Sequence, residues 1–292
     1  MRLWRQLSFL FLISAIHGLT LSGTGNCDTK RALILSYLIT NPTNMPVSGA
    51  KFYTYLPLDK TSWQKLIRVE HSCSNATLIH DSLGNTILGC NLPLMPPYSN
   101  LPVDVRAWLQ LKGRPEASTL PPKDRARALG DEPYITPSDK GISSLARRFK
   151  AGSKYLRARR IYNWIKNNIK FKDFISRPMG ATWALRHKSG DCTEGMAIFV
   201  ALARANKIPA KGVAGYLTNR NGRASPLSYH NWALFYGKSA WRIADPKAKI
   251  FDTDYGSYVA TTMLGTRKKR DIPLGPYERF KVTSKLLRVR QL

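Results

Sequence analysis

The sequence predicts an α+β domain preceded by a small β-sandwich domain. Two observations lead to this prediction. Short runs of β-branched and aromatic residues occupy the chain up to residue 111, whereas residues 142–246 show helical periodicity and then three strand-like segments. At 292 residues and 43% hydrophobic content, the chain is long enough for two domains with separate cores.

The N-terminus has the features of a secretory signal. Arg2 and Arg5 precede an apolar run at residues 7–16, and small residues follow up to Gly25. The run is too short to span a bilayer. We therefore assign residues 1–25 to a signal peptide and expect an exported protein, periplasmic or secreted after cleavage.

Residues 26–112 are predicted to form the β-sandwich domain. Six short segments, often alternating in polarity, are separated by Pro, Asn, Asp and Gly. In an oxidising compartment Cys73 and Cys90, which a predicted hairpin separates, are candidates for a disulfide. The six predicted strands are residues 32–40, 51–58, 65–73, 76–81, 85–94 and 103–111.

Residues 113–140 are rich in Pro and charge without an apolar period, and we predict a linker there. The remaining residues, 141–292, are assigned to a second domain with helices, an antiparallel sheet and a last strand near the C-terminus. Within the helix at 153–171, Leu156, Ile161, Ile165 and Ile169 are expected on one apolar stripe. The predicted elements are helices at 142–150, 153–171, 180–188 and 191–206, and strands at 210–218, 229–237 and 240–246.

The formal net charge of +28 is concentrated in the second domain. Residues 1–112 contain 10 Lys and Arg against 5 Asp and Glu, whereas residues 113–292 contain 36 against 13. Such a positive field attracts anionic partners, among them acidic peptides, envelope polymers, lipid headgroups and nucleic acid. Charge alone does not choose between them.

Cys192 lies where a helix is predicted to begin, in the stretch KSGDCTEG, with Asp191 and Glu194 as candidate caps of that helix. Unpaired backbone N–H groups at a helix start favour a thiolate and also stabilise an oxyanion. A nucleophilic thiol further needs a base, and the base needs an acceptor that orients it. His230 and Asp245 lie on the two strands of a hairpin predicted to have a three-residue turn at Gly237, Lys238 and Ser239. They are eight residues before and seven after its centre at Lys238, so we expect them side by side.

Three segments of the sequence resemble the signature blocks of the transglutaminase-like superfamily of papain-like cysteine enzymes: GDCTEGMAIFVALARANKIPAKGVAGY, YHNWALFY and WRIADP. The preceding strands resemble the β-domain of some bacterial members. The resemblance implies a papain-like core in which Cys192 is the nucleophile, His230 the general base and Asp245 the orienting carboxylate.

The predicted function is cysteine-dependent acyl transfer on amide bonds of peptides or proteins through a thioester. We favour hydrolysis by a peptidase or amidase over cross-linking by a transglutaminase. An inactive basic module that binds an anionic partner is the alternative from another class. Trp183, Glu194 and Trp232 are weaker candidates for substrate binding.

No cofactor or metal is expected, because no spacing of His, Cys or acidic residues resembles a zinc or calcium site. The expected partner is an anionic peptide, protein or envelope polymer, with peripheral contact to an anionic membrane surface as a further role. No specific nucleic acid is expected, and the oligomeric state stays open.

Overall fold

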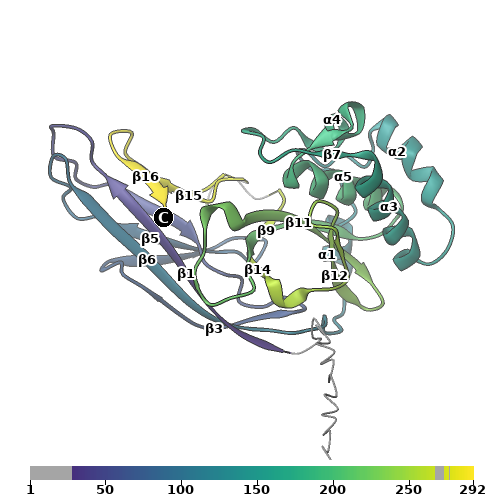
Figure 1. Cartoon of the computed structure of the whole chain (residues 1–292), viewed down its shortest axis with the longest axis horizontal. Coiled ribbons are helices and arrows are strands. Elements are labelled where there is room, and N and C mark those ends of the chain that lie inside the picture. The colour runs from purple at the N-terminus through teal and green to yellow at the C-terminus, as the bar shows by residue number, and fades with distance from the viewer. Residues whose placement is uncertain (1–27, 267–272, 276) are drawn as a thin grey trace, which may run out of the picture.

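The computed structural model describes residues 28–266, 273–275 and 277–292 (Figure 1). The predicted signal peptide and Cys27 lie outside these residues. Within the described ranges, no helix is long and apolar enough to cross a membrane.

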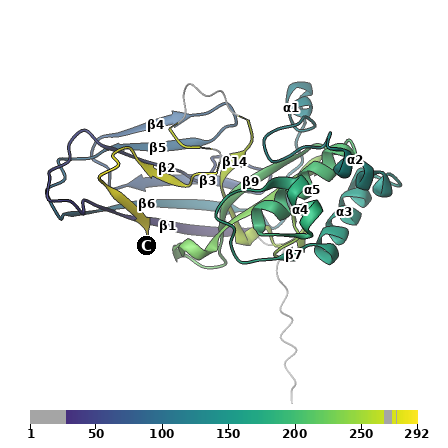
Figure 2. The same cartoon turned by 90° about the horizontal axis from the view of Figure 1, so that it is seen from above.

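The strands of the N-terminal part of the chain, joined by three short strands from later in the sequence, form two β-sheets packed face to face, as Figures 1 and 2 show. The strands are β1 (Thr29–Thr40), β2 (Lys51–Tyr55), β3 (Gln64–His71), β4 (Ala76–His80), β5 (Thr86–Asn91), β6 (Asn100–Leu111), β10 (Gly222–Arg223), β15 (Phe280–Val282) and β16 (Arg288–Gln291). One sheet has the order β10-β1-β6-β3 with β16 also pairing with β1, and the other has the order β15-β2-β5-β4.

Alternating side chains hold these sheets together. Leu33, Leu35 and Tyr37 of β1 are each 1% exposed, because every second residue of a strand points to the same face. The Tyr37 ring lies 5.0 Å from that of Phe52 on β2, and its hydroxyl hydrogen-bonds to Thr54 at 2.7 Å. The predicted β-sandwich is therefore confirmed.

The C-terminal segment returns to this sandwich. The sequence predicts one strand there, within the domain assigned to residues 141–292, but β15 pairs with β2 and β16 pairs with β1. Leu286 lies between these two strands and is 47% exposed. The backbone N–H of Lys51 donates a hydrogen bond to the hydroxyl of Thr283, which is 232 positions later in the sequence. Local sequence patterns do not indicate pairing between residues so far apart in the chain. The boundaries between domains otherwise stay a prediction.

The second part of the chain packs helices on an antiparallel sheet with the order β13-β12-β11-β9-β14. Its strands are β9 (Ala210–Leu217), β11 (Tyr229–Gly237), β12 (Ala240–Asp245), β13 (Ile250–Phe251) and β14 (Tyr258–Leu264). Its helices are α2 (Lys140–Ala146), α3 (Lys154–Asn168), α4 (Gly180–His187) and α5 (Cys192–Ala205). Short elements complete it: η1 (Arg147–Phe149), β7 (Lys170–Phe171), β8 (Ser189–Gly190), η2 (Pro226–Ser228) and η3 (Tyr255–Ser257).

Helix α5 is the centre of this α+β part. Every residue from 194 to 204 is buried, which agrees with its nearly continuous apolar sequence. The helix packs against α2, α3 and α4 on one side and against β9 and β11 on the other. This arrangement, with helices on one face of an antiparallel sheet, is the predicted fold class.

Helix α3 follows its predicted amphipathic pattern with one exception. Ile161 and Ile165 are fully buried, but Leu156 is 49% exposed. Five residues advance an α-helix by one turn and a further ~140°, so Leu156 cannot share a stripe with Ile161. Our assignment of Leu156 to the buried stripe is wrong.

The segment at 113–140, predicted as a linker, contains the short helix α1 (Pro122–Arg127) and contacts both parts of the molecule. Arg127 donates a 3.0 Å hydrogen bond to the carbonyl of Ser82 in the sandwich. The backbone N–H of Ala210 on β9 donates to the carbonyl of Ala128 at 2.9 Å. These contacts attach the segment to the surface of both parts.

Candidate active site

The start of α5 positions Cys192 in the first helical turn. Asp191 is the N-cap, and its carboxylate accepts from the backbone N–H of Thr193 at 2.7 Å. Glu194 completes a capping box by accepting from the N–H of Asp191 at 3.1 Å. Cys192 is half-buried and, among the described residues, is the free cysteine. The cap therefore fixes a partly accessible thiol at the positive end of a buried helix.

The hairpin of β11 and β12 brings His230 and Asp245 together. His230 Nε2 lies 2.6 Å from Asp245 Oδ2, and both residues are buried. The connection is a two-residue turn at Lys238 and Ser239, both with positive φ, rather than the three-residue turn expected from the sequence. In this register Ala244 pairs with Ala233, so the next residue, Asp245, lies opposite Trp232. His230 is two residues before Trp232 on β11, and it therefore meets Asp245 diagonally across the two strands.

Two opposing effects act on the His230 ring. Burial disfavours its charged form, whereas hydrogen bonds and charge from Asp245 and Cys192 favour that form. The second effect wins, and the pKa of His230 is raised from 6.5 to about 9. At neutral pH the His230 ring is therefore positively charged, and it lies beside Asp245 and Cys192.

Asp245 is held by three donors. Besides His230, the hydroxyl of Tyr258 on β14 donates to Oδ2 at 2.9 Å, and the N–H of Ala248 donates to Oδ1 at 3.0 Å. Burial, followed by the charge of Asp245, raises the pKa of Tyr258 far above its usual range, so this hydroxyl stays a donor. Sequence reasoning missed Tyr258, because nothing near it in the chain points to Asp245.

A second side chain that sequence reasoning missed connects the strand to the helix. Asn231 follows His230 on β11 and is 7% exposed, and its Nδ2 donates to the Thr193 hydroxyl at 2.9 Å. Since Thr193 follows Cys192, this bond ties the histidine strand to the cysteine helix. The only signal in the sequence is the position of each residue directly after a candidate catalytic residue.

Two of the three residues proposed for substrate binding are buried. Glu194 is 0% exposed, and its Oε1 accepts from the N–H of Met179 at 2.9 Å, so it serves as a cap instead of a substrate contact. Burial raises its pKa, opposed by these backbone hydrogen bonds. Trp232 is also 0% exposed and packs edge-on against Tyr258, with ring centroids 5.0 Å apart. Both assignments are corrected, since solvent-inaccessible side chains do not contact a substrate.

Trp183 remains the accessible candidate of the three. It is half-buried on α4, and its ring stacks on that of His187 with centroids 4.4 Å apart. Its role in substrate binding stays a prediction.

Cys73 and Cys90, predicted as a tentative pair, are joined in a disulfide with their Cα atoms 5.6 Å apart. The bond lies in the sandwich part, where Cys90 belongs to β5. In the part of the chain that the structure describes, no group of three or more His, Cys, Asp or Glu side chains is arranged to hold a metal ion.

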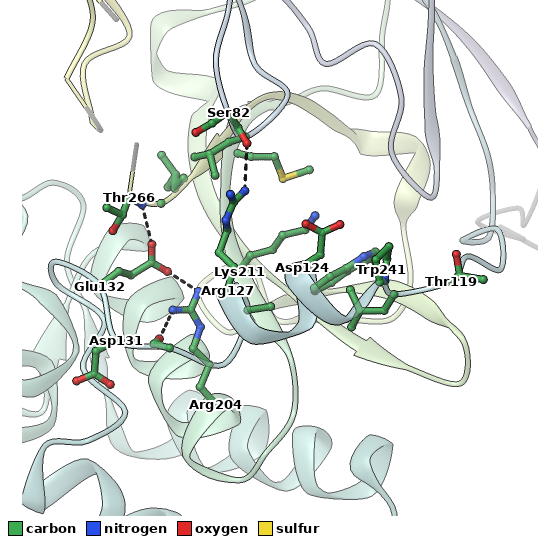
Figure 3. Close-up of a pocket in the computed structure, with 18 residues that line it drawn as sticks. Ser82, Thr119, Asp124, Arg127, Asp131, Glu132, Arg204, Lys211, Trp241 and Thr266 are labelled. Carbon is green, nitrogen blue, oxygen red and sulfur yellow. Dashed lines mark hydrogen bonds and ion pairs between the residues drawn. The ribbon is translucent and has the colours of Figure 1, made fainter. Parts of the chain in front are cut away.

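A cavity of about 520 Å³ lies where α1, β9, β12 and the end of β14 meet (Figure 3). Lys211 enters it beside the ring of Trp241, whose centroid is 4.2 Å from the ammonium. Burial lowers the pKa of Lys211 to about 8, opposed by the charge of Asp124. None of Cys192, His230 and Asp245 lines this cavity, so it is separate from the candidate triad.

Comparison with known proteins supports the resemblance seen in the sequence. Residues 143–246 match the model of the transglutaminase-like superfamily, a range that contains all three candidate triad residues. The search of curated proteins found no match.

The solved structures similar to this chain include two bacterial proteins. One, described as "a Putative Cysteine Protease from Cytophaga hutchinsonii", is 14% identical with a TM-score of 0.59, and the alignment covers 91% of this chain and 92% of that chain. The periplasmic domain of TgpA from Pseudomonas aeruginosa is 16% identical with a TM-score of 0.41, covering 74% of this chain and 90% of that chain. The first similarity shows a shared fold over almost the whole chain, and the second is too distant to support a conclusion.

Proposed function

From the transglutaminase-like core at residues 143–246, we propose that the protein is a cysteine-dependent acyl-transfer enzyme that acts on amide bonds of peptides or proteins. The observation that carries this proposal is the 2.6 Å bond between His230 and Asp245 beside a thiol at a helix start. Nucleophile, base and orienting carboxylate are the three roles that such chemistry requires.

In the proposed mechanism the Cys192 thiolate attacks the amide carbonyl carbon. The C–S bond forms while the carbonyl electron pair moves to oxygen, and backbone N–H groups at the start of α5 stabilise this oxyanion. His230 gives its proton to the leaving amine as the C–N bond breaks, which leaves a thioester on Cys192. Asp245 keeps the ring oriented and stabilises its charged form throughout.

We propose water as the acceptor that completes the reaction. Neutral His230 then takes a proton from water, hydroxide attacks the thioester, and Cys192 leaves as thiolate with release of a carboxylate product. Because Cys192 is half-buried and not sealed from solvent, water reaches the position of the thioester. An amine in place of water would give a cross-link.

The proposal includes an exported location and an anionic substrate. A disulfide such as Cys73–Cys90 persists in an oxidising compartment, which agrees with the signal predicted at residues 1–25. The excess of Lys and Arg over Asp and Glu in residues 113–292 favours acidic peptides or envelope polymers as substrates.

The decisive experiment uses the chain from Asp28, which contains the whole described fold. It is incubated with a peptide library and a labelled primary amine, and the products are identified by mass spectrometry. We expect cleaved amides, and Cys192→Ala should abolish cleavage, whereas His80→Gln, at an exposed position on β4 of the sandwich, should retain it. Incorporation of the amine instead of cleavage would replace hydrolysis with cross-linking. Cleavage that survives in Cys192→Ala would refute the proposed mechanism.

A further inference from the structure

One segment of the second part of the chain contains basic residues and no acidic residues to balance their charge. Residues 140–172 contain eleven Lys and Arg and no Asp or Glu, although Asp139 and Asp173 flank them. The segment includes α2, η1, α3 and β7. We define the basic helical face as six exposed cations on η1, α3 and the turn between them: Arg147, Arg148, Lys150, Lys154, Arg159 and Arg160.

The basic helical face lies on the outer surface of the molecule. Figures 1 and 2 both place α2 and α3 at the end farthest from the β-sandwich. Helix α3 buries Ala158, Ile161 and Ile165 against the core, whereas Arg159 and Arg160 on its other side are exposed.

Within the described residues, no ion pair neutralises this face. Arg159 lies over the ring of Phe251 at 5.9 Å, and Arg160 donates to the carbonyl of Ala151 at 2.7 Å, so both contacts leave the positive charge in place. Burial lowers the pKa of Lys188 at the end of α4, and the charge of Arg148 lowers it further. The positive charge of this face therefore has no ion-pair partner in the described part of the chain, and an anionic partner would neutralise it.

Two features of the face favour a lipid surface over a single-stranded nucleic acid. Leu156 projects among the cations with 49% of its surface exposed, and an apolar side chain gains free energy when it enters a membrane interface. Base stacking requires free aromatic rings. The two aromatic rings of α3 beside this face, Tyr155 and Trp164, already lie under Lys238 at 3.8 Å and Lys188 at 4.5 Å.

We propose that the basic helical face binds the surface of a bilayer containing anionic phospholipid, with Leu156 inserted at the interface. Each cation near such a surface increases binding roughly fivefold, and cations farther than about 8 Å from it are largely screened at physiological salt. The contribution of a charge to binding therefore depends on its position in the fold.

The test measures co-sedimentation of the chain from Asp28 with vesicles of phosphatidylglycerol and phosphatidylcholine, and with vesicles of phosphatidylcholine alone. The variant Arg148→Gln/Lys150→Gln/Lys154→Gln removes three exposed cations for which the described structure shows no side-chain hydrogen bond. We expect its partition coefficient on the anionic vesicles to fall about a hundredfold, with little binding of any variant to the neutral vesicles.

A matched control removes the same charge from the sandwich, at three exposed residues: Lys51, Lys65 and Arg106. This control should bind nearly as the original chain does, and equal losses in the two triple variants would overturn the proposal in favour of a general effect of net charge. Circular dichroism of each variant shows whether the fold is kept.

A second pair of variants tests the apolar contact. Leu156→Ser should weaken binding to anionic vesicles severalfold at all salt concentrations, whereas Leu78→Ser, at a position 54% exposed on β4, should not. If Leu156→Ser has no effect and a single-stranded DNA oligonucleotide binds more tightly than the vesicles, the partner is a nucleic acid and the proposal fails. Binding should be indifferent to Cys192→Ala, so this test is independent of the proposed catalysis.

Discussion

Replacing His230 by glutamine tests the electrostatic account of the site. The pKa of His230 is raised from 6.5 to about 9, a difference that corresponds to about 3 kcal/mol of free energy. Because the folded protein binds this proton more tightly than the unfolded chain, the stabilisation is complete below pH ~6.5 and is lost as the pH rises through ~9. Glutamine fills a similar volume and donates to Asp245, but it does not titrate.

The measurement is urea unfolding of the two proteins at several pH values, followed by tryptophan fluorescence. Subtracting the free energies of unfolding removes the contribution of titrating groups that do not interact with His230. The difference between wild type and His230→Gln should fall by about 3 kcal/mol between about pH 6 and about pH 9.5. Asp245→Asn, which removes one of the groups that favour the charged ring, should lose part of this pH dependence. A difference that stays constant across the range would refute the reasoning.

Three further perturbations test the surroundings of the triad and the sandwich. Tyr258→Phe removes a donor from the buried carboxylate of Asp245 and should lower the free energy of unfolding by about 2 kcal/mol in urea titrations; an unchanged midpoint would contradict the 2.9 Å bond. In Gly190→Ala the new Cβ would lie 2.3 Å from a Glu194 side-chain atom, so a loss of about 1–3 kcal/mol is expected, whereas Gly130→Ala, with ordinary 3.7 Å contacts, should be nearly neutral by the same assay. Reduction of the disulfide, whose cysteines are 17 residues apart, should cost about 3 kcal/mol, measured as a shift of the unfolding midpoint with and without reductant.

The sequence was sufficient for the features that depend on local patterns. The cap at Asp191 and the apolar run after it predict where α5 begins, and the short turn at 237–239 predicts that His230 and Asp245 meet. Both predictions use residues that are close in the chain, and the 2.6 Å bond confirms the second. The register was less accurate, since the turn has two residues instead of three.

The tertiary structure alone decided which side chains surround the triad and which are accessible. Tyr258 reaches Asp245 from a strand that sequence analysis did not predict, and Trp232 and Glu194 are buried although their types allow substrate contact. The C-terminal strands β15 and β16 join a sandwich that begins at residue 29. Local periodicity records only which face of an element is apolar, whereas burial and pairing depend on contacts between residues that are distant in the chain. The sequence therefore determined the candidate chemistry and its local supports, and the packing of distant segments determined how that chemistry is enclosed.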